Sequence, residues 1–248
     1  MSIEGLSVVV TGAGTGIGRS IAERAARSGA KVTLVGRRAT PLKEVAASAP
    51  EAMEAVALDV TDPDAPDRIV AAALGRFGRL DAIVNNAGLA RFGPVGETDV
   101  AELTAMFEVN VRAPASLIRA ALPHLEAGRG SIVNVTSVGG ALSMPGRSYY
   151  GATKAALNSM TRSLAREFAP GVRVNAILPG PVDTPLWRET GMTDDEEQAL
   201  RDGLLAATPM ARFGEGDEIA GWVCNLIDPE LSGWVTGALI PVDGGRTA

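Results

Sequence analysis

Short apolar runs alternate with helix-like segments along the whole chain of 248 residues. An apolar run bounded by turn residues is typical of a buried strand, and an amphipathic segment after it is typical of a helix that covers the strand. Because parallel strands need such crossovers, the alternation predicts a doubly wound α/β fold, with one parallel sheet between two layers of helices. The expected strands are 6–10, 31–35, 55–58, 82–84, 132–135, 172–177 and 238–242, and the expected helices are 17–28, 41–48, 65–77, 100–122, 150–168 and 218–226.

The chain is expected to form one domain, because glycine and proline punctuate the turns and no low-complexity linker separates two halves. The segment 185–209 departs from the alternation. It combines a run of acidic residues with the apolar side chains of Leu186, Trp187 and Met192. A long insert of this mixed composition predicts a lid over a ligand site.

Composition narrows the possible partners and the location. The formal net charge of -6 argues against nucleic acid or an anionic membrane as the main partner. Cys224 is the only cysteine, so we expect neither a disulfide framework nor a thiolate metal site. No apolar run approaches the ~20 residues of a membrane span, and residues 1–5 lack the features of a signal peptide. These features predict a soluble, cytoplasmic protein.

The only histidine, His124, follows Pro123, a residue that we expect to end a helix. A serine–histidine–acid triad would have to use this histidine. The position instead predicts a surface or capping role.

A glycine-rich turn joins the first expected strand to the first expected helix. Glycines there allow a tight turn and let a pyrophosphate approach the helix N-terminus, where free N–H groups and the helix dipole favour anions. A structural turn could use the same residues, but the placement between strand and helix favours a nucleotide site. A Walker P-loop is excluded, because Ala13 stands in place of its first glycine and the lysine is missing. The residues expected at the nucleotide are Gly12, Gly14, Thr15, Gly16, Ile17 and Gly18.

Two arginines, Arg37 and Arg38, follow the second expected strand. Folds that bind NAD usually place an acidic residue near this point for the ribose 2′-hydroxyl, but the strand ends in Gly36. Guanidinium groups suit bidentate binding of a 2′-phosphate, so the pair predicts NADP(H). Two solvated arginines, with NAD(H) as cofactor, remain the alternative. Some NADP-binding proteins of this fold also carry a basic residue in the glycine loop. This chain has Thr15 there, which slightly favours the alternative.

Two further strand ends are expected to meet the same nucleotide. Asp59 and Val60 end the third expected strand, where Asp59 is positioned to accept from the adenine amino group. Asn86, Ala87 and Gly88 follow the fourth strand and are positioned to line the other side of the cofactor.

Tyr150 and Lys154 are four residues apart on an expected helix and so share one face. A free tyrosine has a pKa near 10 and is a poor acid–base catalyst at neutral pH, whereas a neighbouring cation favours the phenolate. Lowering the pKa by roughly three needs about 4 kcal/mol, which a shielded cleft can supply. Two unrelated polar residues on a surface helix are the alternative.

Together these motifs resemble the short-chain dehydrogenase/reductase family, in its compact single-domain branch with a Rossmann fold. The resemblance covers the full length, and the family's order and spacing are kept. The residues that carry it are 11–18, Asp59 and Val60, 85–88, Asn110, Ser137, Tyr150 and Lys154, Pro179 and Gly180 with Thr184, and 242–245.

The resemblance implies an oxidoreductase that interconverts a ketone and a secondary alcohol. Tyr150 would be the general acid–base, and Ser137 would hydrogen-bond the carbonyl oxygen. Lys154 would bind the nicotinamide ribose and lower the pKa of Tyr150, while Asn110 would hold a water in a proton relay. The implied cofactor residues after the sixth strand are Pro179, Gly180, Val182 and Thr184, the last two at the carboxamide.

Pro114 lies four residues after Asn110 on the same expected helix. Because proline has no N–H, the Asn110 carbonyl loses its helical donor and needs another partner, for which water is the obvious candidate. This position agrees with the relay role and predicts a kink in the helix.

Three other functions compete with an NADP-dependent carbonyl reductase. An NAD-dependent alcohol dehydrogenase would share the fold. A cofactor-sensing regulator would not need a tyrosine, lysine, serine and asparagine together. A sugar-nucleotide epimerase shares the Tyr-x-x-x-Lys motif but usually has a longer carboxy-terminal domain.

The family resemblance also implies a homo-oligomer, a tetramer before a dimer, that packs helices 100–122 and 150–168 against symmetry mates. The small-molecule substrate is not defined by the sequence. Its pocket should involve residues 90–95, 138–149 and 185–209. Leu142, Met144, Trp187 and Met192 suggest an apolar ligand, while Arg91, Arg147 and Arg188 leave an acidic group open.

Overall fold

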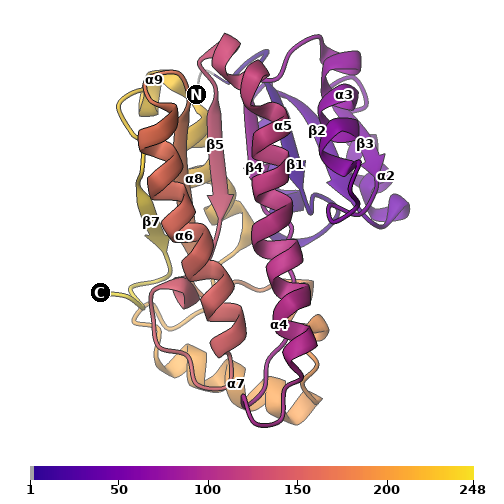
Figure 1. The fold of residues 1–248 in the computed structure, drawn as a ribbon. Helices are drawn as coiled ribbons and strands as arrows, with labels where there is room; N and C mark the ends of the chain where they lie inside the picture. Colours follow the sequence, from indigo (N-terminus) through magenta and orange to yellow (C-terminus); the bar gives the residue numbers. More distant parts are fainter. Residues whose placement is uncertain (1–2) are drawn as a thin grey trace.

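The computed structural model describes residues 3–248 and contains a seven-stranded parallel sheet (Figure 1). The strand order is β3-β2-β1-β4-β5-β6-β7, so the predicted doubly wound fold is confirmed. Met1 and Ser2 lie outside the described residues. They belong to residues 1–5, in which we expected no signal peptide. The strands are β1 Ser7–Thr11, β2 Lys31–Gly36, β3 Met53–Ala57, β4 Ala82–Asn85, β5 Ser131–Val135, β6 Arg173–Pro179 and β7 Leu239–Val242.

Helices cover both faces of the sheet, with α5 and α6 in front of it and α8 behind it in Figure 1. Successive strand residues point to opposite faces. Val8 and Val10 therefore join a buried cluster with α1, α2 and α8, whereas Val9 joins a second cluster with α3, α5 and α6. The helices are α1 Gly16–Arg27, α2 Ala39–Ala47, α3 Ala65–Phe77, α4 Val100–Phe107, α5 Ala113–Gly128, α6 Ser148–Phe168, α7 Asp194–Ala206, α8 Gly216–Ile227 and α9 Pro229–Ser232.

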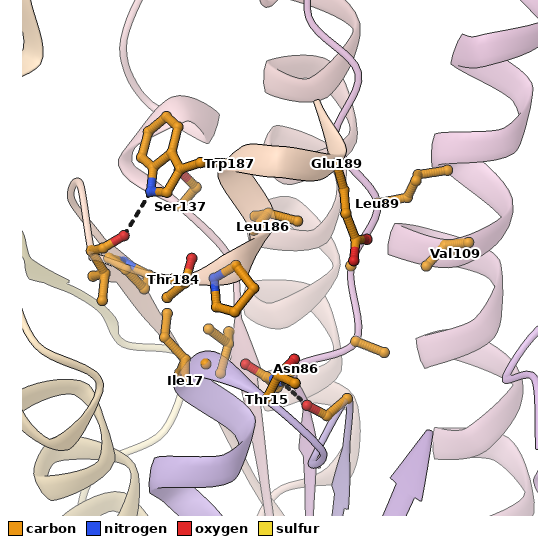
Figure 2. Close-up of a pocket in the computed structure, with 18 of the residues that line it drawn as sticks. Thr15, Ile17, Asn86, Leu89, Val109, Ser137, Thr184, Leu186, Trp187 and Glu189 are labelled. Atoms are coloured by element: carbon orange, nitrogen blue, oxygen red, sulfur yellow. Dashed lines mark hydrogen bonds between the residues drawn. The ribbon is translucent and has the colours of Figure 1, made fainter. Parts of the chain in front are cut away.

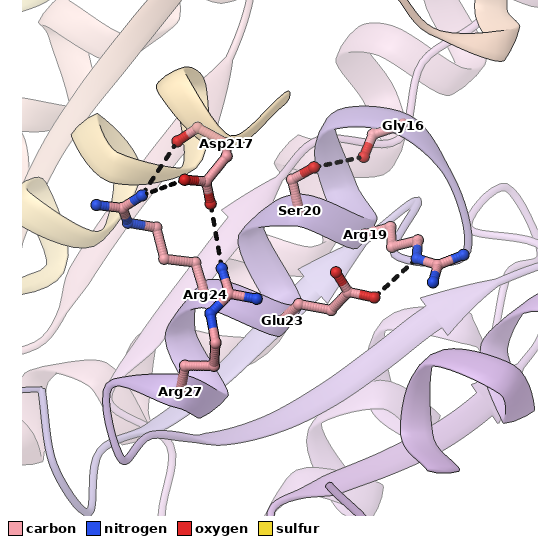
Figure 3. Close-up of polar contacts among 7 residues, drawn as sticks. All are labelled: Gly16, Arg19, Ser20, Glu23, Arg24, Arg27 and Asp217. Carbon is pink, nitrogen blue, oxygen red and sulfur yellow. Dashed lines mark hydrogen bonds and ion pairs between the residues drawn. The ribbon is translucent and has the colours of Figure 1, made fainter. Parts of the chain in front are cut away.

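Helix α1, which starts in the glycine-rich turn, is held against α8 (Figure 3). Asp217 of α8 accepts from Arg24 at 2.5 Å and from Arg27 at 3.2 Å. Exposed ion pairs of this kind contribute at most about 1 kcal/mol each. Burial of apolar side chains dominates the contact, and the residues concerned are Ile21, Ala22 and Ala25 of α1 with Ile219, Ala220 and Val223 of α8.

The prediction of one α-helix over residues 100–122 is wrong. Helix α4 ends at Phe107, and a π-helical turn, Glu108–Arg112, precedes α5. The N–H of Ala113 bonds to the carbonyl of Glu108, five residues back. Because Pro114 cannot donate to the Asn110 carbonyl, regular α-helical bonding is interrupted at this point. A π turn therefore lies where the sequence predicted a kink.

The prediction that Pro123 ends a helix is also wrong, because α5 continues to Gly128. Pro123 is exposed, so the carbonyl that loses its donor can bond to water. The buried side chains of Leu117, Ala121 and Leu125 lie on the opposite side and keep the helix packed on the sheet. His124 lies within α5 and is partly exposed.

Each strand boundary lies within two residues of the expected one, and two of them differ by two residues. β3 begins at Met53, which pairs with Val32, and β6 extends to Pro179, which pairs with Val242. No helix formed by residues 3–248 combines the length and the apolar character that a membrane crossing requires.

Candidate functional site

A deep cleft lies at the carboxyl ends of the strands, and residues that follow each strand from β1 to β6 line it. β1 and β4 are neighbours at its centre, where the chain order of the sheet reverses. Such a switch point is where doubly wound sheets bind ligands. The cleft brings together every sequence-predicted site residue except Gly18 and Asn110.

The glycine loop fits the pyrophosphate of a dinucleotide. Gly12 and Gly16 have φ values of 67° and 53°, which disfavour any side chain. A Cβ on Gly12 would lie 2.9 Å from Asn86 Nδ2, and one on Gly18 would lie 2.2 Å from the Gly12 carbonyl oxygen. Gly18 therefore lies behind the loop and supports it. The absence of side chains keeps the N-terminus of α1 open to an anion.

We expect Gly18→Ala to lower the free energy of unfolding by about 1–3 kcal/mol, because the new methyl must displace the loop backbone. Gly75→Ala is the matched control, since a Cβ there meets nothing within 4 Å and lies inside α3. It should be neutral or raise stability by up to about 1 kcal/mol. Urea unfolding of both variants checks this, and a Gly18→Ala protein as stable as the wild type would contradict the packing described.

Thr11, to which sequence reasoning gave no role, holds two strand ends together. Its Oγ1 accepts from the N–H groups of Asn86 and Ala87, both at 3.0 Å, and Asn86 Nδ2 donates to the Thr11 carbonyl at 2.9 Å. The side chain of Asn86 is therefore used for positioning the loop against β4. The sequence signals were the place of Thr11 at the end of a strand and its membership of the stretch 11–18 that carries the family resemblance.

The far end of the cleft carries positive charge. Arg37 and Arg38 are exposed and line it, and no carboxylate among residues 3–248 lies within ion-pair distance of either. Nearby, Asp59 accepts from Thr61 N at 2.9 Å and Thr61 Oγ1 at 2.7 Å. Burial raises the pKa of Asp59, but these hydrogen bonds and the charge of Arg37 outweigh burial and lower it.

At the other end, Tyr150 and Lys154 are buried side by side on α6, with exposed fractions of 9% and 4%. Lys154 Nζ lies 5.6 Å from the centroid of the Tyr150 ring and donates to the Val135 carbonyl at 3.2 Å. Burial lowers the pKa of Lys154 to about 8.

That Lys154 lowers the pKa of Tyr150 stays a prediction, and other groups set the pKa of this phenol in the structure. Burial raises the pKa of Tyr150, and a hydrogen bond with Ser137 and the charge of Arg147 oppose that rise. The ammonium group of Lys154 lies over the Tyr150 ring and is itself desolvated. The phenol is therefore protonated at neutral pH.

Asn110 is 1% exposed, and three hydrogen bonds hold its side-chain amide. Nδ2 donates to the Leu89 carbonyl at 2.9 Å and to Thr153 Oγ1 at 3.0 Å, while Oδ1 accepts from Leu89 N at 2.8 Å. The amide thus joins the segment after β4 to α6. Two acceptor positions remain for a water at Asn110, namely the second lone pair of Oδ1 and the backbone carbonyl, which Pro114 leaves without the usual donor.

The segment after β6 closes one side of the cleft (Figure 2). A Cβ on Gly180 would lie 2.7 Å from the Cα of Asp243, so only glycine fits there. Trp187 Nε1 donates to the Val182 carbonyl at 2.9 Å and fixes the 3₁₀-helical turn Pro185–Glu189 beside Thr184. Within the expected lid, Leu186, Trp187, Glu189, Thr190 and Leu204 line the cleft.

Two arginines complete the wall near Tyr150. Arg147 precedes α6, and the sequence analysis named it among three arginines that could accept an acidic group of the ligand. Arg246 follows β7, and the sequence analysis did not identify it. Nothing in its local pattern marks Arg246, because only the fold brings the end of the chain to this cleft.

Comparison with known proteins identifies the family. Residues 12–247 match a family model described as enoyl-(acyl carrier protein) reductase. The chain is similar to meso-2,3-butanediol dehydrogenase of Serratia marcescens, with 35% identity over 100% of this chain and 97% of that protein. It is also similar to cis-4-hydroxycyclohexanecarboxylate dehydrogenase of Sinomonas cyclohexanicum, with 38% identity over 97% of this chain and 96% of that protein.

The structure of 3-ketoacyl-(acyl-carrier-protein) reductase from Brucella melitensis, complexed with NADH, is 33% identical and superposes with a TM-score of 0.92 over 100% of both chains. The family model, the full-length relatives and the superposed structure all indicate the same family. The protein belongs to the short-chain dehydrogenase/reductase family of oxidoreductases, which act on alcohol and carbonyl groups.

Proposed function

We propose that the protein is an NADP-dependent carbonyl reductase with Tyr150 as its general acid–base. The observation that carries this proposal is the arrangement of one cleft, with a glycine loop and two unpaired arginines at one end and Ser137, Tyr150 and Lys154 at the other. The similar proteins from Serratia and Sinomonas are named as dehydrogenases of secondary alcohols, which supports the same reaction class here.

The residues that would hold the cofactor are those that already fit it. The glycine loop would receive the pyrophosphate, Asp59 and Val60 would hold the adenine, and the segment after β6 would bind the nicotinamide. When bound, the nicotinamide supplies a hydride to the carbonyl carbon or accepts one from the alcohol carbon.

Ser137 and Tyr150 would act on the substrate oxygen. Ser137 Oγ accepts from Gly139 N at 3.0 Å, which leaves the hydroxyl proton available for another acceptor. Tyr150 would deliver its proton to the same oxygen during reduction. The raised pKa keeps this phenol protonated, so Tyr150 carries the proton that reduction requires. Lys154 is mainly charged at neutral pH, since its pKa is about 8, and can bind the nicotinamide ribose.

The choice of NADP(H) rests on Arg37 and Arg38, which line the cleft after β2 in place of an acidic residue. Unpaired guanidinium groups are suited to a 2′-phosphate. NAD(H) is the second candidate, because the similar Brucella structure is complexed with NADH.

We further propose that 185–209 closes over bound substrate, that the protein is a homotetramer, and that it works in the cytoplasm. The lid follows from the side chains that this segment places in the cleft. Hydrogen exchange should show fast exchange in the segment and protection after NADPH and ligand are added. A segment as protected as the central strands before addition would contradict the lid, and a monomeric mass by light scattering would contradict the tetramer.

A panel of ketones tests the proposed function directly, with consumption of NADPH and of NADH as the readout. At least one ketone should be reduced to its alcohol, faster with NADPH. Absence of turnover over the whole panel, with folded protein and bound cofactor, would refute it.

A further inference from the structure

Arg147 and Arg246 place two positive charges at the substrate end of the cleft. Both line it together with Ser137 and Tyr150, and both are partly buried. Arg147 precedes α6 by one residue, and Arg246 lies just after β7, so elements far apart in sequence bring them together. Neither belongs to the glycine loop or to the Arg37–Arg38 pair at the other end.

The two guanidinium groups lack a counter-charge within the part of the chain that the structure describes. No carboxylate among residues 3–248 lies within ion-pair distance of either one. Burial lowers the pKa of Arg147, and the like charge of Arg246 lowers it further. Arg246 Nη1 is buried and has no hydrogen-bond partner. Unpaired buried donors and like charges destabilise a fold, so this arrangement favours binding of an anion.

The surroundings place this charge beside the reacting atoms. The Arg147 guanidinium lies 5.9 Å from the centroid of the Phe92 ring, and the Phe92 and Tyr150 rings meet edge to face at 5.6 Å. The charge of Arg147 also reaches the phenol, where it opposes the rise of the Tyr150 pKa. An anion held by Arg147 would therefore lie in the same part of the cleft as a carbonyl at Tyr150.

We infer that Arg147 and Arg246 bind a carboxylate on the substrate, so that the protein reduces keto acids or oxidises the matching hydroxy acids. This inference rests on the proposed function and specifies its substrate class. Reduction moves a hydride from the nicotinamide to the carbonyl carbon and a proton from Tyr150 to its oxygen. The carboxylate is unchanged, and the arginines bind without reacting.

The rest of the wall fits a short apolar body between carboxylate and carbonyl. Leu89, Phe92, Met144 and Trp187 line the same cleft. Glu189 also lines it, but among residues 3–248 it forms no ion pair with either arginine.

The test compares ketones that differ only in charge, namely 4-oxocyclohexanecarboxylate and 4-oxopentanoate against their methyl esters, with NADPH. The wild type should use each acid at least about tenfold better in kcat/KM than its ester, since one charge-assisted hydrogen bond contributes about 10- to 100-fold. Arg246→Gln should remove that preference by lowering kcat/KM for the acids by the same factor, with the esters changed less than about threefold.

Arg147→Gln should lower the acid-to-ester ratio as well, although it also acts on both substrates through Tyr150. Arg68→Gln, an exposed arginine on α3 with the same charge change, is the matched control and should leave every rate unchanged. Cyclohexanecarboxylate should compete with the ketones in the wild type, whereas cyclohexylmethanol should not. Because the inhibition is measured on the wild-type protein, this test does not depend on whether the arginine variants fold.

The outcomes separate the two proposals. Equal use of acids and esters by the wild type overturns this inference and leaves the carbonyl reductase standing. A loss in Arg246→Gln that is the same for acids and esters, or failure of cyclohexanecarboxylate to compete, also overturns it. Absence of turnover with every ketone, charged or neutral, overturns the proposed function and this inference with it.

Discussion

Replacing Tyr150 with phenylalanine is expected to abolish ketone reduction while cofactor affinity stays within a few-fold. The phenol delivers its proton only in the transition state, so its loss lowers kcat by about 10²- to 10⁴-fold and leaves ground-state binding nearly unchanged. The ring itself stays, so its contacts with Phe92 and Lys154 are kept. Steady-state kinetics and NADPH titration measure the two quantities separately.

Tyr149→Phe is the matched control for this prediction. Tyr149 is the only other tyrosine, it precedes Tyr150 directly, and it does not line the cleft. Its variant loses the same hydroxyl and should keep kcat within about threefold. If Tyr150→Phe retained more than about a tenth of the wild-type rate, Tyr150 would not be the general acid–base.

Arg37→Ala and Arg38→Ala are each expected to lower kcat/KM with NADPH by about 10- to 100-fold and to leave the value with NADH nearly unchanged. Each charge-assisted contact with the 2′-phosphate contributes about 1.5–3 kcal/mol, and only NADPH carries that group. The double variant should therefore prefer NADH.

Kinetics with both cofactors, in the wild type and in each variant, check this expectation. Arg68→Ala is the matched control, because it removes the same charge from an exposed arginine outside the cleft. Equal kcat/KM values for the two cofactors in the wild type would contradict the assignment of NADP(H), and the two arginines would then be solvated residues at a strand end.

Much of the fold followed from local patterns. The alternation of apolar runs and helices predicted every strand of the sheet, and the glycine-rich turn predicted where the cleft lies. These features are readable because each depends on residues close in sequence. The break in the long helix could be predicted only in part. Pro114 removes a hydrogen-bond donor, but this alone does not determine that the backbone forms a π turn.

Other features depend on packing that local sequence does not encode. Pro123 stays inside α5 because Leu117 and Leu125 anchor that helix on the sheet. The raised pKa of Tyr150 follows from its burial, which the spacing of Tyr150 and Lys154 does not reveal. Arg246 reaches the cleft only because β7 lies beside β6.

Hydride transfer itself can be followed with NADPH in which both hydrogens at the reactive nicotinamide carbon are deuterium, so that transfer from either face carries the label. The wild-type protein is incubated with this cofactor and a ketone from the panel, and the alcohol is analysed by mass spectrometry. The proposed function predicts one deuterium on the carbinol carbon of every product molecule. It also predicts almost no product with the Tyr150→Phe variant. An alcohol without deuterium, or equal labelled product from the Tyr150→Phe variant, would contradict it.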